Sequence, residues 1–551
     1  MRLQTTRSNR SVLLRFIKAT FMAGLLPALV LLFSVQSSLA GSATWNQNPT
    51  SGDWNTAANW TPATVPNGPS DTATFGTSDV TNLSLSEPTE VNSIVFNPGA
   101  SAFAITASDN GHLIISGVGI VNNSGITQRF VTAVDAFYNL QVVEFDGGAS
   151  AGVSTSFTNT GSIGMGISGG WTYFKNRSTA GQASFTNEGG TFPGTNGGAA
   201  YFFNSTTADH AVIVNNPGTA RGAYGGKVTF SDRGSAEAAI ITNVGGCGGL
   251  DCGTGGYTEF YPGTTASQAT LIAQGGVNTY LEGGTVYFYS DSDGGTARIE
   301  LFDLGTLDLS HNFSGAVNIG SIEGDGVVVL GYGIAASIGV NSRSTIFTGE
   351  IRNGLNESGS LIKVGQGTLT LNGSNTYQDG TVVQEGGLVV DTLVGSGTGT
   401  GAVQVNGGRL GGRGTITGDV TIGSGSGAGA VLIPSAATNR PATLHIYGSV
   451  TFKSDSTYAS KLHPNRGKAD SLLTNGGVTI ESGAVFSFVG NGSATITPGT
   501  VFTVIRNNAA TPIVGTFSNL PDGSTITVGS NTFQANYEGG DGNDLTLTVV
   551  L

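Results

Sequence analysis

GSLIKVGQGTLTLNGSNTYQDGTVVQEGGLVV, residues 359–390, is the stretch of the chain that decides the fold. It reads as strand, turn, strand, turn and strand, because its apolar residues fall at the strand period of two and no helical period is present. Those apolar residues are Leu361, Leu369, Leu371, Val382, Leu388 and Val390. Glycine and asparagine residues separate these apolar strands, at turn positions that favour a positive φ angle. The stretch therefore predicts at least one coil of a β-solenoid.

A longer internal repeat precedes this stretch, between Tyr173 and Glu300. Each copy has a Phe marker, a polar turn, small Ser- and Thr-rich residues, a short apolar strand, and then Asn or Gln before a Gly turn. The markers are spaced 28, 28, 30 and 28 residues apart, and they are Phe174, Phe202, Phe230, Phe260 and Phe288. One such period is too small to bury its own apolar face, so neighbouring copies must stack. We therefore predict a parallel β-helix in which each marker Phe lies above the last in an internal stack.

The composition agrees with an all-β fold. The chain has 88 Gly and 16 Pro in 551 residues, about 19%, below the ~25–30% that is typical of disorder. Only 11% of the residues are charged, and the polar balance comes from Ser, Thr and Asn, which suit strands and turns better than helices. The expected fold is a right-handed parallel β-helix with a terminal β region.

Residues 1–40 read as a secretory signal peptide. Five basic residues precede an apolar run from Phe21 to Val35, and Ser38 and Ala40 supply small residues for cleavage after Ala40. The alternative is an uncleaved anchor, but the run is shorter than the ~20 residues that span a bilayer. Removal of this segment leaves 18 basic against 36 acidic residues, a formal charge of −18. Such a surface disfavours nucleic acid and anionic membranes, and the mature chain is not expected to be an integral membrane protein.

Three regions are expected after the signal peptide: an N-terminal capping β region at 41–110, the parallel β-helix at 111–440, and a C-terminal β region at 441–551 that closes the solenoid. The first of these contains Trp45, Trp54 and Trp60. We expect these rings to plug the open end of the solenoid, which would otherwise expose a sheet edge. The alternative is that the rings stack on sugars.

Gly359–Val390 closely resembles the autotransporter-associated β-strand repeat of passenger regions in Gram-negative bacteria. Lys363, the GTLTL from Gly367, the SNTY from Ser374 and the GGLVV from Gly386 all fit that repeat. The segments GSIEGDG from Gly320, YEGGDGNDLTL and GDWNTAANW are also similar to segments of such proteins. The resemblance implies a β-helical passenger whose stepwise folding at the cell surface helps to drive export.

The chain departs from that pattern at its end. An autotransporter ends in a membrane barrel of about a dozen strands with an aromatic final residue, whereas this chain ends at Leu551 after one strand of LTLTVVL. A passenger-type protein without the C-terminal translocator barrel is therefore expected. It would depend on separate export machinery, remain in the periplasm, or be released by general secretion.

Several motifs that usually carry chemistry have plainer interpretations here. Cys247 and Cys252 favour a local disulfide in an exported chain, with free thiols as the alternative. Ser168 stands in a G-x-S-x-G match that lacks the helix a nucleophile elbow needs. The run Gly425–Ala430 imitates a dinucleotide loop but reads as turns. The five histidines, at 112, 210, 311, 445 and 463, share no motif.

Two acidic patterns were weighed as sites. Asp291 with Asp293 and Glu323 with Asp325 are each two residues apart, and carboxylates on neighbouring coils can cleave sugars, although both sequences are also ordinary turns. The second pattern, Asp541, Asn543 and Asp544, matches one calcium-binding nonapeptide unit, and a single copy favours a turn. We therefore predict no catalytic, cofactor-binding or metal-binding residues and no cofactor.

The expected function is that of an exported, non-catalytic β-helical protein with a structural, adhesive or display role. It would act beyond the inner membrane, at the cell surface or outside the cell, with the periplasm as the alternative. The rival hypothesis is a polysaccharide-binding or polysaccharide-cleaving β-helix, whose partner would be a cell-surface or extracellular polysaccharide. An outer groove built from Trp45, Trp54, Trp60 or Trp171 beside paired carboxylates would favour that rival.

Overall fold

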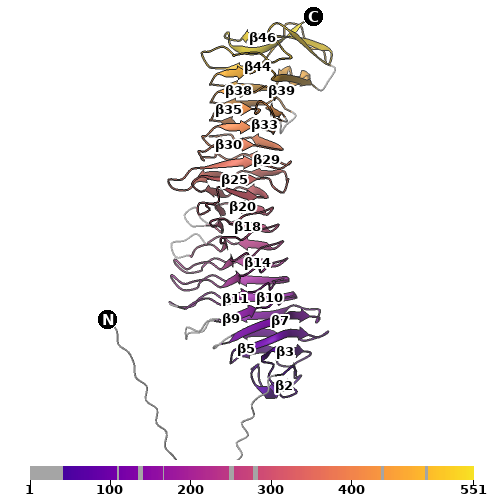
Figure 1. Cartoon of the computed structure of the whole chain (residues 1–551), viewed down its shortest axis with the longest axis vertical. Coiled ribbons are helices and arrows are strands. Elements are labelled where there is room, and N and C mark those ends of the chain that lie inside the picture. Colours follow the sequence, from indigo (N-terminus) through magenta and orange to yellow (C-terminus); the bar gives the residue numbers. More distant parts are fainter. Residues whose placement is uncertain are drawn as a thin grey trace, which may run out of the picture. The chain divides into compact units, whose positions relative to one another are not determined.

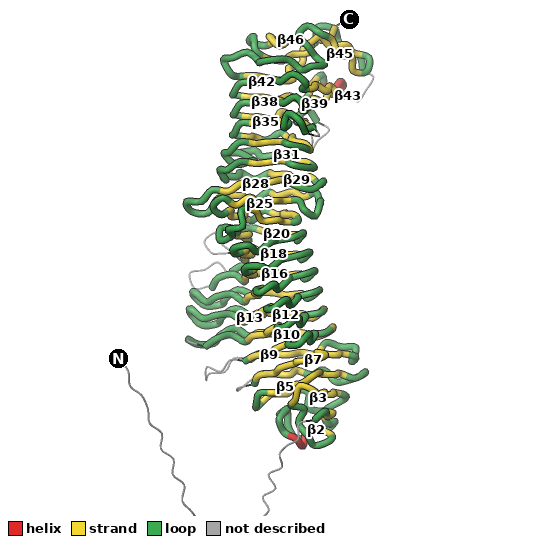
Figure 2. Tube along the Cα trace, viewed as in Figure 1, coloured by secondary structure: helices red, strands yellow, loops and turns green. Residues whose placement is uncertain are grey.

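The computed structural model describes residues 41–107, 111–133, 141–165, 167–246, 253–276, 283–427, 429–435, 440–490 and 494–550. The segment Ala40–Leu551 forms one compact unit, and only this unit is described below. Strands stack one above another in this unit, and loops join them at the corners (Figures 1 and 2). The predicted all-β parallel β-helix is confirmed. The signal peptide and the Cys247–Cys252 pair lie outside the described residues.

Sheet 1 runs along the N-terminal part of the solenoid, and all its pairings are parallel except that of β1 with β2. Its strands, in order along the sheet, are β2 (Trp60–Thr61), β1 (Ala43–Trp45), β3 (Gly68–Phe75), β5 (Thr89–Phe96), β7 (His112–Asn122), β9 (Val142–Phe145), β11 (Trp171–Phe174), β13 (Ala199–Phe202), β15 (Lys227–Phe230), β17 (Tyr257–Phe260), β19 (Thr285–Phe288), β21 (Thr306–Asp308), β24 (Val327–Leu330) and β27 (Glu350–Asn353).

Sheet 2 continues through almost the whole unit and gives each coil its second side. Its parallel strands are β4 (Asn82–Leu85), β6 (Ala104–Ala107), β8 (Gln128–Thr132), β10 (Val153–Asn159), β12 (Gln182–Asn187), β14 (Val212–Asn215), β16 (Ile240–Asn243), β18 (Thr270–Gln274), β20 (Arg298–Phe302), β23 (Ser321–Gly324), β26 (Thr345–Phe347), β29 (Thr368–Leu371), β31 (Gly387–Val390), β33 (Gly408–Gly412), β36 (Ala430–Ile433), β39 (Ser456–His463) and β43 (Val485–Gly490). The short β40 (Lys468–Ala469) pairs antiparallel with β39.

Two further sheets form the C-terminal half. Sheet 3 consists of β22 (Ala316–Ile319), β25 (Ile334–Ile338), β28 (Gly359–Lys363), β30 (Thr381–Val383), β32 (Val403–Val405), β35 (Val420–Ile422), β38 (Val450–Phe452) and β42 (Val478–Ile480). Sheet 4 consists of β34 (Thr415–Ile416), β37 (Thr443–Ile446), β41 (Ser471–Thr474), β44 (Val501–Asn507), β45 (Thr525–Val528), β46 (Asn531–Gly539) and β47 (Asp544–Val550). The described helices are two single 3-10 turns, Ala57–Asn59 and Pro464–Arg466.

The marker phenylalanines form the internal stack that the repeat predicts. Register pairs such as Phe174 with Phe202 place each marker directly above the previous one. The ring centroids of successive markers from Phe174 to Phe288 lie 4.6, 4.9, 4.9 and 4.7 Å apart, with interplanar angles between 2° and 16°. Rings at this spacing are in contact, so the stack is a continuous buried column.

Asparagines end the second strand of four successive coils and form a ladder inside the solenoid. The ladder consists of Asn159, Asn187, Asn215 and Asn243, all fully buried. The side-chain Nδ2 of each of the first three donates to the Oδ1 of the next asparagine at 2.7 Å, and Asn243 Nδ2 donates to Thr285 O at 2.9 Å. Thr132 caps the lower end, and Thr258 donates to Asn243 at 2.9 Å at the upper end. The 28-residue spacing therefore places buried amides in register as well as rings, so that the polar groups are satisfied.

The stretch 359–390 supplies β28 to β31, two successive levels of sheets 2 and 3. Lys363 is buried at the end of β28, and its Nζ donates to the carbonyls of Val364 at 2.6 Å, Gly365 at 2.8 Å and Glu385 at 3.2 Å. Tyr377 is also buried, with its hydroxyl 2.5 Å from Thr381 Oγ1. Lys363 thus ties the turn after β28 to the equivalent turn after β30 on the next level.

The three N-terminal tryptophans are 0–2% exposed and pack on Phe75 and on one another. Each indole N–H donates to a backbone carbonyl: Trp45 to Val80, Trp54 to Pro66, and Trp60 to Trp54. The expectation that they fill the end of the solenoid is confirmed. The alternative of sugar stacking by Trp45, Trp54 and Trp60 is wrong, because their faces are already covered.

The C-terminal end replaces parallel by antiparallel pairing. β47 lies between β44 and β46, antiparallel to both, and β45 pairs antiparallel with β46. Figure 1 shows β44 and β46 at this end of the described unit. These pairings provide hydrogen-bond partners for the backbone groups of the last parallel strand, β44. They fit the expected terminal β region. The boundaries at 110 and 440 remain predictions.

Candidate aromatic binding face

Sheet 1 carries a row of aromatic side chains on its outer surface. Within each strand the marker Phe points inward, so the residues on either side of it point outward. The outward positions of β11 to β19 and of the turns after them hold Trp171, Tyr173, Tyr201, Phe203, Tyr257, Tyr261, Tyr287 and Tyr289. We call these eight residues the aromatic face. The rings are half-buried or exposed, unlike the marker stack beneath them.

The lower part of the aromatic face is a cluster on β11 and β13. The Trp171 ring lies 5.7 Å from Tyr173 and 5.6 Å from Tyr201, edge-on to both. Tyr173 and Tyr201 are register partners on adjacent strands, with centroids 5.1 Å apart. Phe203 closes the cluster at 5.8 Å from Tyr173. Trp171 is thus the one sequence-predicted tryptophan that lies on an outer face.

An ion pair joins this cluster to the upper one. Lys227 on β15 places its Nζ 5.5 Å from the ring centre of Tyr201 and 5.6 Å from that of Tyr257, so the cation lies against both rings. The same Nζ is 3.2 Å from Glu259 Oε2, which also accepts a hydrogen bond from Thr229 at 3.0 Å. Opposite charges therefore cancel in the middle of the face.

The upper part of the aromatic face surrounds a cavity of about 190 Å³. Tyr261 stacks on Tyr289 at 5.0 Å, and Tyr287 stacks on Tyr289 at 5.7 Å. The cavity exists because Thr285 follows Tyr257 in the outward column, leaving space where another ring would fit. It is lined by Tyr224, Thr254, Gly255, Tyr257, Glu259, Gly283, Thr285, Tyr287 and Tyr289.

Burial favours the protonated form of four tyrosine hydroxyls on the face. It raises the pKa of Tyr201 to about 12, and raises the pKa values of Tyr173, Tyr257 and Tyr289 above the ordinary value of 10. Below the face, His112 and then Lys175 hold the pKa of Glu144 below its ordinary value against the effect of burial. The hydroxyls can therefore donate and accept hydrogen bonds across the neutral pH range.

The two acidic pairs weighed as catalytic candidates are used structurally. Asp291 accepts the backbone N–H of Gly263 at 2.8 Å, and Asp293 accepts those of Asn318 and Gly295. Glu323 forms an ion pair with Arg298. Asp325 accepts the backbone N–H of Asp303 at 2.8 Å. Each of the four carboxylates is thus held by a turn or by a cation.

The Gly-rich and nucleophile-like motifs also form turns. Ser168 precedes strand β11, not a helix, so the elbow geometry is missing. In the loop at 424–427, the backbone N–H groups of Ser424, Gly425 and Gly427 donate to the carboxylate of Asp455. The chain's own aspartate therefore occupies the anion-binding backbone that the Gly-rich run offers.

The calcium-like unit connects β46 to β47. Asp544 is buried and accepts the backbone N–H of Asn507 at 2.9 Å, and Asn543 Nδ2 donates to Ala509 O at 2.5 Å. Asp541 is exposed. The segment forms the turn between these two strands. No group of three or more potential metal ligands occurs in the part of the chain that the structure describes.

The five histidines lie apart, as their lack of a shared motif suggests. His112 Nε2 is 3.3 Å from Glu144 Oε2, and His210 is 2.5 Å from Asp209. His463 is buried against Asp470 at 3.1 Å. The remaining two pack on tyrosine rings, His311 on Tyr289 and His445 on Tyr447.

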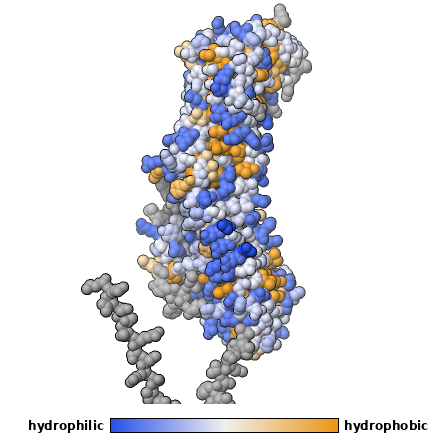
Figure 3. All heavy atoms as spheres, in the orientation of Figure 1, coloured by the Kyte–Doolittle hydropathy of each residue, from blue (hydrophilic) through white to orange (hydrophobic). Residues whose placement is uncertain are grey.

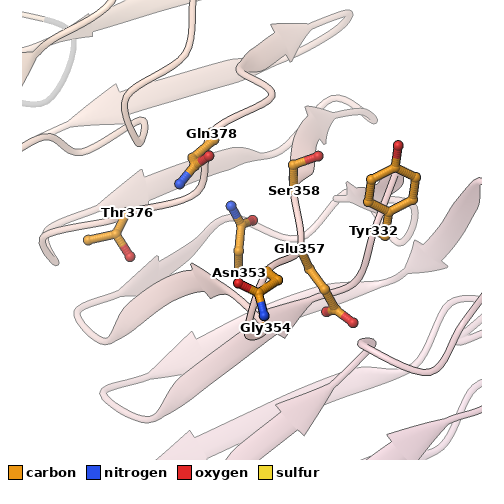
Figure 4. Close-up of a pocket in the computed structure, with 8 residues that line it drawn as sticks. Tyr332, Asn353, Gly354, Glu357, Ser358, Thr376 and Gln378 are labelled. Atoms are coloured by element: carbon orange, nitrogen blue, oxygen red, sulfur yellow. The ribbon is translucent and has the colours of Figure 1, made fainter.

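A larger and more polar hollow lies between loops of the middle coils (Figure 4). We call it the loop pocket; its volume is about 680 Å³, and it is lined by Tyr332, Asn353, Gly354, Asn356, Glu357, Ser358, Thr376 and Gln378. Asn353 Nδ2 and Glu357 Oε2 are buried there without a hydrogen-bond partner. Asn353 Oδ1 accepts the N–H of Gly359 at 3.0 Å. The loop pocket has a single aromatic ring, Tyr332, and that ring is 75% exposed.

The surface elsewhere mixes polar and apolar residues. The face drawn in Figure 3 shows hydrophobic residues in small patches between hydrophilic ones. None of the helices in the described ranges is both long and apolar enough to serve as a membrane span. The aromatic face therefore stands out by its residue type and by its extent: its rings lie on four of the five coils from β11 to β19, and Lys227 and Thr229 occupy the β15 coil between them.

Comparisons with known proteins concern the export repeat and the fold. The Passenger-associated-transport-repeat family has a sequence model that matches residues 361–390. Among solved structures, the chain is similar to the crystal structure of the Haemophilus influenzae Hap adhesin, at 10% sequence identity and a TM-score of 0.30. That match covers 87% of this chain and 58% of the Hap chain, so this chain spans less than two thirds of it. No curated protein matches the chain.

The resemblance inferred from Gly359–Val390 is confirmed by the family match. The aromatic face, in contrast, was missed in the sequence, although its signal was present. Tyr173, Tyr201 and Tyr287 each directly precede a marker Phe. Since neighbours in a strand point to opposite sides, an aromatic residue beside each buried marker predicts an outward row.

Proposed function

We propose that this chain, which carries a passenger-associated transport repeat, is an exported β-helical protein that binds an extracellular partner through its aromatic face. The repeat at 361–390 supports export as a passenger-like protein. The place of action would be the cell surface or the extracellular space. The role is adhesive or display, and it includes no catalytic step.

The aromatic face is the observation that carries this proposal. Folding buries large apolar side chains where it can, and the marker column beneath shows that this chain does so. Eight aromatic residues nevertheless remain on one outer surface, on four of five successive coils. Contiguous exposed aromatic residues are typical of interaction sites, because each ring brings a large contact area at low entropic cost.

The contacts within the face favour binding over catalysis. Glu259 is tied to Lys227 and Thr229, and Glu144 is tied to Lys175 at 2.9 Å. A glycosidase needs one carboxyl group that stays protonated beside a second that is ionised. The influence of His112 and Lys175 on Glu144 acts against the protonated form.

A panel measurement tests the proposal. Purified residues 41–551 would be tested against immobilised glycans and extracellular-matrix proteins, with soluble product assayed in parallel. We expect saturable binding to at least one panel member and no released fragment. Release of sugar or peptide fragments would contradict the non-catalytic role, and failure to bind any member would contradict adhesion through this face.

A further inference from the structure

The cavity at β17 and β19 is lined by both aromatic side chains and backbone groups. Tyr257 and Tyr287 provide aromatic walls, and Gly255 and Gly283 contribute backbone to the lining. The volume of the cavity is about 190 Å³. A single six-membered ring with its substituents is of this order, whereas a folded peptide segment is not.

Glu259 supplies a hydrogen-bond acceptor inside this cavity. Its Oε2 accepts from Lys227 at 3.2 Å and from Thr229 at 3.0 Å, and its Oε1 accepts from the Tyr261 hydroxyl at 3.5 Å. An ionised carboxylate has about four acceptor positions, so Glu259 retains capacity for a donor from a ligand. A hydroxyl bound there would form a charge-assisted hydrogen bond.

The electrostatics of the cavity favour an uncharged ligand. The Glu259 charge is already balanced by Lys227 at 3.2 Å. The pKa values of Tyr257 and Tyr289 are raised, so their hydroxyls remain neutral. An anionic ligand would meet Glu259 directly, and a cationic ligand would compete with Lys227 for it. A ring that has apolar faces and several neutral hydroxyl groups meets both requirements.

We infer that this cavity is a subsite for one ring of an uncharged polysaccharide. The sugar ring packs against the Tyr257 and Tyr287 rings, which lie edge to face with centroids 6.4 Å apart, and one of its hydroxyls donates to Glu259. The remaining rings of the chain lie along the aromatic face toward Tyr201. This inference rests on the proposed binding function and specifies the chemistry of its partner.

Affinity electrophoresis of residues 41–551 tests the inference. The protein is run in native gels that contain dextran, mannan or galactan, and in gels that contain the anionic polygalacturonate. We expect retardation in at least one neutral gel and none in polygalacturonate. Tyr287→Ala and Glu259→Gln should each weaken the retarded interaction about tenfold, since a stacked ring or a charge-assisted hydrogen bond is lost.

Two further variants separate the subsite from a loss of folding. Thr285→Tyr restores a ring in the column that already holds Tyr257, so it should fill the cavity and abolish retardation in a folded protein. Tyr332→Ala in the loop pocket should leave retardation unchanged. Retardation that survives Thr285→Tyr, or that Tyr332→Ala removes equally, would overturn the subsite.

The outcome also distinguishes this inference from the proposed function. Binding to a matrix protein that is lost in Tyr287→Ala, together with no retardation by any neutral polysaccharide, would overturn the sugar subsite and leave the adhesive function standing. Retardation by polygalacturonate alone would likewise overturn the uncharged ligand.

Discussion

At the scale of single residues, Lys363 shows how one side chain can stabilise the turns of the solenoid by hydrogen bonds. Its ammonium group is buried and reaches three backbone carbonyls. Burial lowers its pKa to about 8, and the nearby Glu385 opposes that shift. The sequence shows that Lys363 belongs to the repeat. Its contacts with the three carbonyls depend on the conformation of the turns at 364–365 and 385. Sequence spacing alone could not predict that conformation.

The lowered pKa of Lys363 should make the free energy of unfolding depend on pH. Its folded pKa of about 8 lies below the ordinary value near 10.5, so between these values the unfolded state binds more protons than the folded state. The free energy of unfolding should therefore rise with pH through this window. From pH 7.5 to 9.5 the rise should be about 2 kcal/mol relative to Lys363→Met. Urea denaturation at several pH values measures it, and parallel pH profiles for the two proteins would contradict the buried, titrating lysine.

At the scale of structural elements, the 28-residue repeat was predictable from the sequence. The positions of its asparagines were also predictable, but their burial and their hydrogen bonds to one another were not. The Phe markers predicted the ring stack because their spacing equals one coil. The pattern also showed Asn or Gln before each Gly turn. The structure establishes the register of β10, β12, β14 and β16. Because of this register, the asparagine side chains point inward and form hydrogen bonds to one another.

Breaking the asparagine ladder should weaken the coils around it. Asn215→Ala removes the acceptor of Asn187 and the donor to Asn243. Two buried amides then lose a partner, which should lower the free energy of unfolding by roughly 2–4 kcal/mol. Denaturant unfolding measures the loss, and hydrogen exchange should show it first in β12 and β16. The matched control is Asn216→Ala, whose half-buried amide bonds to Glu188 and whose loss should cost under ~1 kcal/mol.

Also at this scale, the strand alternation that buries the marker Phe exposes its neighbours. Tryptophan is a misleading signal for an outer face here, because Trp45, Trp54 and Trp60 are buried as a cap. The tyrosines are hard to recognise as a row because the most regular feature of the repeat is its buried Phe. A tyrosine row becomes visible only when the two sides of each strand are considered separately.

At the scale of the whole described unit, stacking turns a short repeat into a long surface. Each coil adds one level to sheet 1, so a residue type repeated in sequence becomes a row in space. The interruption of that row at Thr285 creates the cavity, and the ion pair of Lys227 with Glu259 keeps the row electrically balanced. The fold was thus predictable from periodicity, whereas the site arises from departures from periodicity.

The measurement that tests the central claim most directly compares two triple variants in the binding panel. Tyr201→Ala, Tyr257→Ala and Tyr287→Ala remove three rings of the aromatic face. The control variant, Tyr332→Ala, Leu393→Ala and Tyr447→Ala, removes three exposed side chains elsewhere. We expect the first to lose at least tenfold in affinity for the panel member that the unmodified protein binds, and the second to bind as the unmodified protein does. Equal binding by both variants would contradict a function carried by the aromatic face.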